Sequence, residues 1–295
     1  MIYPVVDRLA GEGFPVAASC RLLGVSTSGF HDWRTRPLSP RAIADAELTA
    51  RIVEAHTLSR GIYGSPRVHA ELKLGMGIAC GRKRVERLMR QAGLQGVSRR
   101  RQKGCTKRNP FDAPSDDLVD RHFAVDGPDQ LWVADITQHR TDQGWVYGAF
   151  VIDAWSRRVL GWSLGDHCRT ELVADALDMA LWRRQGADGC IHHSDHGCQY
   201  TSWAFGHRLR QAGLRGSMGT IGDAYDNAMA ESFFATLQTE LLDRQRWSTR
   251  EQLAQAIFDF VEGFYNPTRR HTSLGMLSPN AFEHQHTTSA VTTAA

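Results

Sequence analysis

Three acidic side chains have types and positions that could do chemistry. Asp135 interrupts the alternating segment LWVADIT, where an apolar residue is expected. Asp195 follows the strand-like run IHHS, and Glu231 lies in the helical segment DNAMAESFFATLQTEL, with 35 residues between it and Asp195. Because a charge on a covered strand is costly unless something compensates it, Asp135 in particular calls for a partner.

Carboxylates brought together raise one another's pKa unless cations lie between them. Mg²⁺ and Mn²⁺ take oxygen ligands and keep positions for water and phosphate. Two such ions about 3.5–4 Å apart can activate the attacking oxygen and stabilise the leaving oxygen of an in-line displacement. Taken together, Asp135, Asp195 and Glu231 fit such a site. Taken singly, each is better explained as a turn cap, a loop residue or an exposed helix position.

Two competing assignments concern neighbouring residues. His192, His193 and His196 are candidate zinc ligands, but adjacent side chains of a strand point to opposite faces, and no second Cys/His cluster completes a tetrahedron. Asp153, in VIDAWSRR, competes with Asp135 as the first acid. We interpret Asp153 as a structural residue at a strand end.

The overall composition is that of an ordered globular protein, with 295 residues of which 42% are hydrophobic. No apolar run approaches the roughly 20 residues that span a bilayer, and the first residues do not form a secretory signal. Six cysteines form no C-x-x-C pair, which favours reduced thiols. We therefore expect a cytoplasmic chain without a membrane partner.

The net charge of +3 conceals an asymmetry. Residues 1–110 hold 20 basic and 8 acidic side chains, a balance of +12, and the rest hold 15 and 24, a balance of −9. This predicts a polyanion-binding front joined to a part that uses carboxylates. Two differently charged solvated surfaces remain the alternative.

The basic front contains two helical segments. Residues 15–34 predict helix, turn and helix, with Gly24 at the turn and Ser26 as a cap, although any compact helical pair needs similar residues. In GRKRVERLMRQAGL, apolar residues share one face and basic residues the other, which suits a helix laid along phosphates or an ordinary solvated helix. The loop YNPTRRHTSLG is either a phosphate contact or a capped turn. The predicted DNA contacts are Lys83, Arg87, Arg90, Arg99, Arg100, Arg101, Lys103, Arg269, Arg270 and His271.

From residue 125 the pattern predicts a mixed α/β fold. Three alternating segments, QLWVADITQHRT, GWVYGAFVIDAWS and RRVLGWSLGD, predict an antiparallel meander. Amphipathic helices, a short strand at GCIHHSDHG and further helices follow. The tail from residue 284 has too little apolar content to pack and is expected to be disordered.

In combination, LWVADIT, HHSDHGCQYTS and DNAMAESFFATLQTEL resemble the DDE transposases of the IS-three insertion-sequence family, of the second-reading-frame type. The resemblance extends from GIYGSPRVHAEL to FYNPTRRHTSLG and so covers most of the chain. It implies a ribonuclease H-like, integrase-like catalytic core preceded by small all-α helix-turn-helix modules. The expected domains are a helix-turn-helix-like segment (1–40), a helical DNA-binding module (41–96), a linker (97–124), the catalytic domain with its C-terminal helix (125–283) and the tail (284–295).

The resemblance implies that Asp135, Asp195 and Glu231 are catalytic and hold two Mg²⁺ or Mn²⁺ ions. The implied activity is cleavage and strand transfer at insertion-sequence ends by a bacterial enzyme that is nucleoid-associated when bound to DNA. The implied partners are terminal inverted repeats, target DNA, further copies of the chain and the product of an upstream reading frame.

One departure from the family pattern is Gln238, where many relatives carry a basic residue seven positions after the glutamate. It puts one DNA contact in doubt. The alternative functions are a non-catalytic DNA-binding regulator or inactive relic, and a ribonuclease H-like hydrolase.

Overall fold

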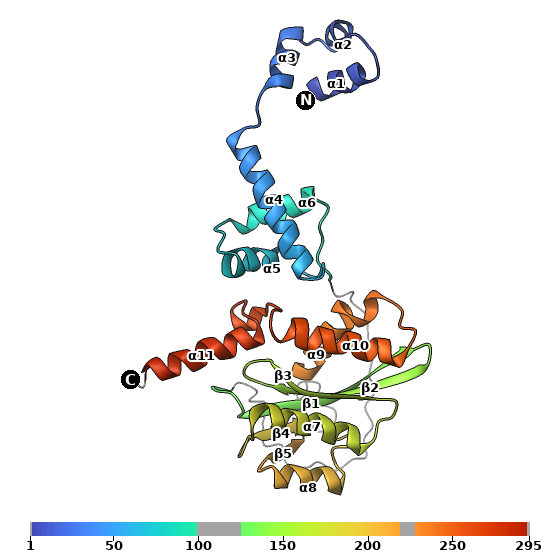
Figure 1. Ribbon diagram of the computed structural model, residues 1–295, viewed down its shortest axis with the longest axis vertical. Coiled ribbons are helices and arrows are strands. Elements are labelled where there is room, and N and C mark those ends of the chain that lie inside the picture. The colour runs from blue at the N-terminus through green and yellow to red at the C-terminus, as the bar shows by residue number, and fades with distance from the viewer. Residues whose placement is uncertain (1, 99–124, 219–227, 294–295) are drawn as a thin grey trace. The chain divides into compact units, whose positions relative to one another are not determined.

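The computed structural model describes residues 2–98, 125–218 and 228–293 (Figure 1). The chain divides into two compact units, Met1–Val53 and Glu54–Ala295. None of the described helices combines the length and the apolar character needed to cross a bilayer.

The first unit contains the predicted helix-turn-helix. Its helices are α1 (Tyr3–Gly11), α2 (Val16–Leu22) and α3 (Thr27–Thr35). Gly24 turns the chain with a φ of +68°, and the Ser26 hydroxyl accepts a 3.0 Å hydrogen bond from the Gly29 N–H. Cys20 and Phe30 are buried together, so the small cysteine allows the two helices to approach closely.

A helical module opens the second unit. The long helix α4 (Pro40–Leu58) crosses the division between units and is followed by α5 (Ser65–Ala70), the π-helical turn η1 (Glu71–Gly75) and α6 (Arg82–Gln91). The predicted apolar face of α6 is confirmed at Val85, Leu88 and Met89. It is wrong at Ala92, which is exposed because α6 ends at residue 91 and Gly93 turns away with a φ of +68°.

A five-stranded mixed sheet organises the rest of this unit. Its strands are β1 (Leu131–Thr141), β2 (Gly144–Asp153), β3 (Val159–Gly165), β4 (Ile191–Ser194) and β5 (Arg215–Met218), in the order β3-β2-β1-β4-β5. The predicted meander is confirmed, since β1 pairs antiparallel with β2 and β2 with β3. β4 runs parallel to β1 and β5 parallel to β4.

Helices cover both faces of this sheet (Figure 1). One face packs on α7 (Thr170–Arg184) and α8 (Trp203–Gln211) through a core that includes Trp132 and Ala134 of β1. On the other face, Leu131 and Val133 pack on the start of α9 (Ala228–Glu240). The chain continues through η2 (Leu242–Arg244), α10 (Arg250–Phe260), η3 (Val261–Tyr265), η4 (Thr272–Leu274) and α11 (Pro279–Thr293).

The expected disorder from residue 284 is not what the structure shows, because α11 continues to Thr293. The rings of Phe282 and His286 lie 4.8 Å and 5.3 Å from the ring of Trp155, measured between centroids. These aromatic contacts hold the helix past residue 284, although the sequence there is poor in aliphatic residues.

Candidate active site

The parallel pairing of β1 with β4 brings Asp135 and Asp195 side by side in the middle of the sheet. In the β1–β4 pairing, Leu131 lies opposite Ile191 and Val133 opposite His193. Continuing this register by two residues places Asp135 opposite Asp195, the first residue after β4. The pairing of β1 with β4 thus brings together two acids that are sixty residues apart in the sequence.

Glu231 reaches the same face through the packing of α9. Leu131 and Val133 of β1 pack on Met229 and Ala230 at the start of that helix. Because side chains alternate along a strand, Asp135 projects on the same face as Leu131 and Val133. Glu231 lies in the first turn of α9 and is exposed. All three acids therefore belong to one region of the fold.

The pKa of Asp135 is sensitive to the two other acids. Burial, and then repulsion from Asp195 and Glu231, raise the pKa of Asp135 to about 7, against the lowering effect of a 2.7 Å hydrogen bond from the Ile136 N–H to its carboxylate. Among the described residues, however, no group of three or more His, Cys, Asp or Glu side chains lies close enough to hold a metal ion. The acids are nevertheless near enough for Asp195 and Glu231 to raise the pKa of Asp135 by repulsion.

Sequence reasoning missed Tyr200, which packs in the core with Trp132 and Phe205 and interacts electrostatically with both aspartates. Its hydroxyl is buried and has no hydrogen-bond partner among the described residues. Burial, followed by the charges of Asp135 and Asp195, raises the pKa of Tyr200 well above its ordinary value. Periodicity cannot reveal such a residue, because Tyr200 reads as an ordinary core aromatic beside Phe205.

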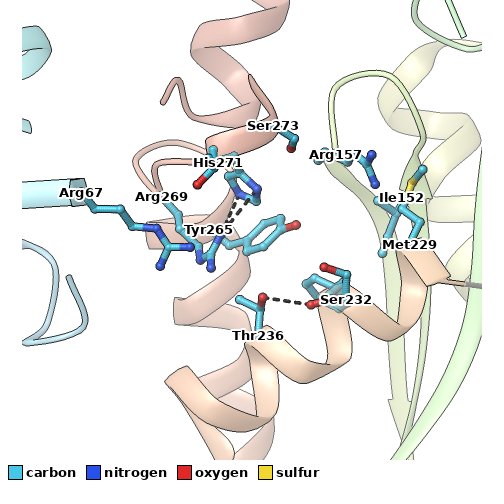
Figure 2. A pocket seen from close by; sticks show the side chains of 12 residues that line it. Arg67, Ile152, Arg157, Met229, Ser232, Thr236, Tyr265, Arg269, His271 and Ser273 are labelled. Atoms are coloured by element: carbon cyan, nitrogen blue, oxygen red, sulfur yellow. Dashed lines mark hydrogen bonds between the residues drawn. The ribbon is translucent and has the colours of Figure 1, made fainter. Parts of the chain in front are cut away.

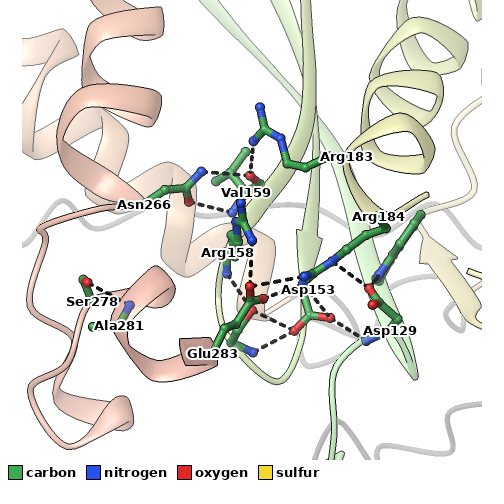
Figure 3. A network of polar contacts seen from close by, with 12 residues as sticks. Asp129, Asp153, Arg158, Val159, Arg183, Arg184, Asn266, Ser278, Ala281 and Glu283 are labelled. Atoms are coloured by element: carbon green, nitrogen blue, oxygen red, sulfur yellow. Dashed lines mark hydrogen bonds and ion pairs between the residues drawn. The ribbon is translucent and has the colours of Figure 1, made fainter. Parts of the chain in front are cut away.

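Asp153 belongs to a buried polar network (Figure 3). Its side chain is fully buried; one carboxylate oxygen accepts hydrogen bonds from the Ser156 N–H and hydroxyl at 2.7 and 2.9 Å, and the other accepts one from the Asp129 N–H at 2.9 Å. Arg184 lies 3.9 Å from this carboxylate and also pairs with Glu283. The structure thus agrees with a structural role for Asp153 at its strand end.

The adjacent histidines do face opposite ways. His192 packs against the Phe205 ring at 5.4 Å, whereas the His193 ring shares a 3.1 Å hydrogen bond with the Ser217 hydroxyl of β5. Burial lowers the pKa of His192 to about 4, so this side chain is neutral in the core. The zinc alternative finds no support within the residues that the structure describes.

Of the predicted DNA contacts in the front part, Lys83 and Arg90 are exposed on α6, and Arg87 is half-buried. Arg90 pairs with Glu86 at 3.2 Å, and Arg87 donates to the Gln91 side chain at 3.2 Å. Their role on DNA stays a prediction. Four others lie outside the described residues: Arg99, Arg100, Arg101 and Lys103.

The predicted contacts near the C-terminal end are more enclosed than expected. Arg269 is buried and forms two hydrogen bonds with Glu240, of 2.7 and 2.6 Å. Arg270 donates to Glu71 at 2.8 Å, and His271 is buried beside Arg269. These bonds show why the loop is ordered, while DNA contact by the three residues stays a prediction. Gln238, the departure from the family pattern, donates to Asp243.

Family comparisons separate a helical region in the front part of the chain from an integrase core that follows it. An integrase core domain family matches residues 125–224, and a second integrase core domain family matches residues 212–279. An HTH-like domain family matches residues 43–102. This last match covers the helical module of the second unit, not the helix-turn-helix of residues 15–34.

The chain is similar over nearly its whole length to bacterial transposases. It is 38% identical over 289 residues to the transposase InsF for insertion sequence IS3A of Escherichia coli (strain K12), covering 97% of this chain and 99% of that protein. It is 36% identical over 267 residues to an uncharacterized 31 kDa protein of insertion element IS600 from Shigella sonnei, covering 90% and 98%.

Comparison with solved structures returns viral integrases. A simian T-cell lymphotropic virus intasome in complex with PP2A regulatory subunit B56 gamma matches with a TM-score of 0.45 and 15% identity, covering 79% of this chain and 74% of that chain. The HTLV-2 integrase catalytic core domain in complex with magnesium matches with a TM-score of 0.39 and 15% identity, covering 53% and 97%.

Proposed function

Because this chain belongs to the family of IS3-type insertion-sequence transposases, we propose that Asp135, Asp195 and Glu231 form its DDE catalytic centre. The supporting observation is the β1–β4 register, which when continued sets Asp135 beside Asp195. The start of α9, which carries Glu231, packs on the same face of β1. Such a centre can cut and join phosphodiester bonds through bound divalent ions. The predicted integrase-like core is confirmed by the domain matches.

The three side chains suit a hard divalent cation. They offer carboxylate oxygens, which Mg²⁺ and Mn²⁺ prefer. The described groups that shift the pKa of Asp135 include two acids and no basic side chain, so its charge has no built-in counterion there. Two ions held by Asp135, Asp195 and Glu231 would supply Lewis-acid stabilisation of the oxygens that enter and leave the phosphorus.

The protein's own contribution is positioning. Asp135 is fixed by the sheet and by the Ile136 N–H, so its carboxylate has a defined orientation. The Asp195 carboxylate accepts a 3.0 Å hydrogen bond from the Gly197 N–H, which restricts the conformations of the loop after β4. The reaction has two steps: water first attacks the phosphodiester at an element end and frees a 3′-hydroxyl. That hydroxyl then attacks a phosphodiester of the target DNA, so that a new phosphodiester joins the two strands as the P–O3′ bond of the target breaks and releases the target's 3′-hydroxyl.

The substrates we propose are DNA ends with terminal inverted repeats and a target duplex, bound by several copies of the chain. The basic front fits a polyanionic partner of this kind. The product of an upstream reading frame is a further proposed partner.

A nicking assay tests the proposal. Full-length protein is incubated with DNA carrying the ends of its own element, with Mg²⁺ or Mn²⁺ and with EDTA. Nicking is expected only with metal, and Asp135→Asn, Asp195→Asn and Glu231→Gln should each abolish it while binding survives. Nicking by the triple variant would refute the assignment.

The open spacing of the three acids favours one second candidate, a DNA-binding regulator without catalysis. The same assay separates the two functions. A parent protein that binds the element ends tightly and never nicks them, with either metal, is a regulator.

A further inference from the structure

A basic cavity of about 330 Å³ lies beside α9, and nothing in the catalytic proposal uses it (Figure 2). Three arginines line it from distant parts of the sequence: Arg67 from α5, Arg157 from the β2–β3 turn and Arg269 from the loop after η3. The serine and threonine side chains at the cavity are Ser232, Thr236, Thr272 and Ser273, and Tyr265 adds a phenolic hydroxyl. The lining thus offers cationic and neutral hydrogen-bond donors together.

The cations of this cavity outnumber their carboxylate partners. Arg67 and Arg269 share Glu240, at 3.1 Å and 2.6 Å from the same oxygen. The Arg157 guanidinium makes no hydrogen bond or ion pair in the described part of the chain, and its interactions with Tyr265 and Asp153 are longer-range. In Figure 2 the Tyr265 side chain lies between Arg269 and Arg157. Three positive charges therefore face the space with one directly paired negative charge.

The pKa of His271, which also lines the cavity, is lowered by the same excess of positive charge. Burial, and then the charges of Arg269, Arg67 and Arg157, lower the pKa of His271 to about 2. The side chain is therefore neutral at physiological pH, and all the lining cations are arginines. Arginine is the residue best suited to phosphate, since its planar fork donates several hydrogen bonds at once.

The cavity continues toward the candidate catalytic glutamate. A neighbouring cavity of about 340 Å³ is also lined by Arg67, Ser232, Thr236 and Arg269, and it includes Glu231. Glu231 and Ser232 are consecutive, so the two spaces adjoin along α9. A nucleic-acid strand with one phosphodiester near Glu231 would have its next phosphodiesters within reach of the arginines.

We infer that the cavity between Arg67, Arg157 and Arg269 binds a backbone phosphodiester of the DNA strand held at Glu231. The inference rests on the proposed function, since it requires DNA as the substrate. Arg157 is the expected principal contact because its guanidinium has no directly paired carboxylate among the described residues. The exposed hydroxyls of Thr272 and Ser273 at the rim add neutral donors. Contacts to phosphate position a strand and carry no sequence information.

The test measures DNA affinity without catalysis. Full-length protein in EDTA is titrated against a fluorescent duplex carrying the element end, by anisotropy at several KCl concentrations. For Arg157→Gln we expect affinity about 5- to 10-fold lower at 0.1 M salt and a salt slope smaller by about one, as for the loss of one phosphate contact. Arg157→Lys should keep the slope. Ser273→Asp adds a charge at the exposed rim without disturbing the core and should weaken binding similarly.

Matched controls fix the interpretation. Arg246→Gln removes a charge from an exposed arginine paired with Asp142, and Ser248→Asp adds one at an exposed serine; neither should change the slope as much. Parental affinity and slope in Arg157→Gln and Ser273→Asp would overturn the inference, even where the parent nicks DNA and the proposed function stands.

A final arm separates DNA from a free anion. Inorganic phosphate is added to the parent and to Arg157→Gln at constant ionic strength, and thermal unfolding is followed. Stabilisation of the parent by phosphate, combined with parental DNA binding by Arg157→Gln, would assign the cavity to a free anion and overturn the inference. Competition between phosphate and DNA for the parent, lost in Arg157→Gln, supports it.

Discussion

Replacing Asp135 by Asn is expected to stabilise the metal-free protein while abolishing its activity. The substitution keeps the size of the side chain and removes its charge. A rise of the Asp135 pKa from 3.8 to about 7 corresponds to at most about 4 kcal/mol of destabilisation once the carboxylate is ionised. Part of this is lost, because an amide oxygen accepts the Ile136 N–H less strongly than a carboxylate does. We expect a gain of about 2 kcal/mol in the free energy of unfolding at pH 8.

The effect has a defined dependence on pH. The unfolded Asp135 side chain loses its proton near pH 3.8, whereas the folded one keeps it until about pH 7. This group therefore makes the parent less stable as pH rises from about 4 to about 7, and Asp135→Asn removes that decrease. The effect of removing this charge should be small at pH 4, intermediate near pH 5.5 and full at pH 8.

Urea unfolding followed by circular dichroism measures both quantities, in EDTA and in 10 mM MgCl₂. Magnesium should raise the free energy of unfolding of the parent at pH 8, because ligand binding to the folded state stabilises it. It should have little effect on Asp135→Asn. If the variant in EDTA at pH 8 were as stable as the parent or less so, the repulsion we derive would not exist.

Three further substitutions test how the fold positions the site. Gly161→Ala should destabilise the protein by about 3 kcal/mol or more in chemical denaturation, because its Cβ would lie 1.9 Å from the Ala176 carbonyl oxygen. Arg184→Met should cost about 3–5 kcal/mol in the same assay, because it removes the cation that the carboxylates of Asp129, Asp153 and Glu283 share. Ser26→Ala should lower the stability of the first unit by about 1 kcal/mol through loss of the α3 cap, measured by the thermal melt of that unit.

Each of these has a control in the chain. Gly206→Ala, whose Cβ would meet only the end of Arg210 at 3.5 Å, should be tolerated. Arg246→Met removes an exposed pair and should cost less than 1 kcal/mol. Equal losses in test and control would show that packing and burial are not the causes.

Local patterns were sufficient where one element decides the outcome. The alternation of LWVADIT predicted β1 and singled out Asp135, and Gly24 with Ser26 predicted the first helix-turn-helix. The resemblance, carried by motifs rather than by periodicity, supplied the family and the integrase-like core. It also supplied the triad as a unit, which no single acid justified.

Features that depend on packing between distant segments could not be predicted from the sequence. β5 was not predicted, because its four residues RGSM have no alternation and become a strand through pairing with β4. The burial of Arg269 depends on Glu240, 29 positions away, and cannot be seen in YNPTRRHTSLG. The basic cavity escaped for the same reason, since Arg67 and Arg157 meet only in the folded chain.

The most direct measurement is the anomalous scattering of Mn²⁺ in crystals of the full-length protein bound to DNA carrying its element end. The account predicts manganese between the carboxylates of Asp135 and Asp195, with Glu231 completing the ligands at distances of about 2.1 Å. Manganese bound elsewhere, or three carboxylates that stay apart at saturating Mn²⁺ with DNA in place, would contradict it.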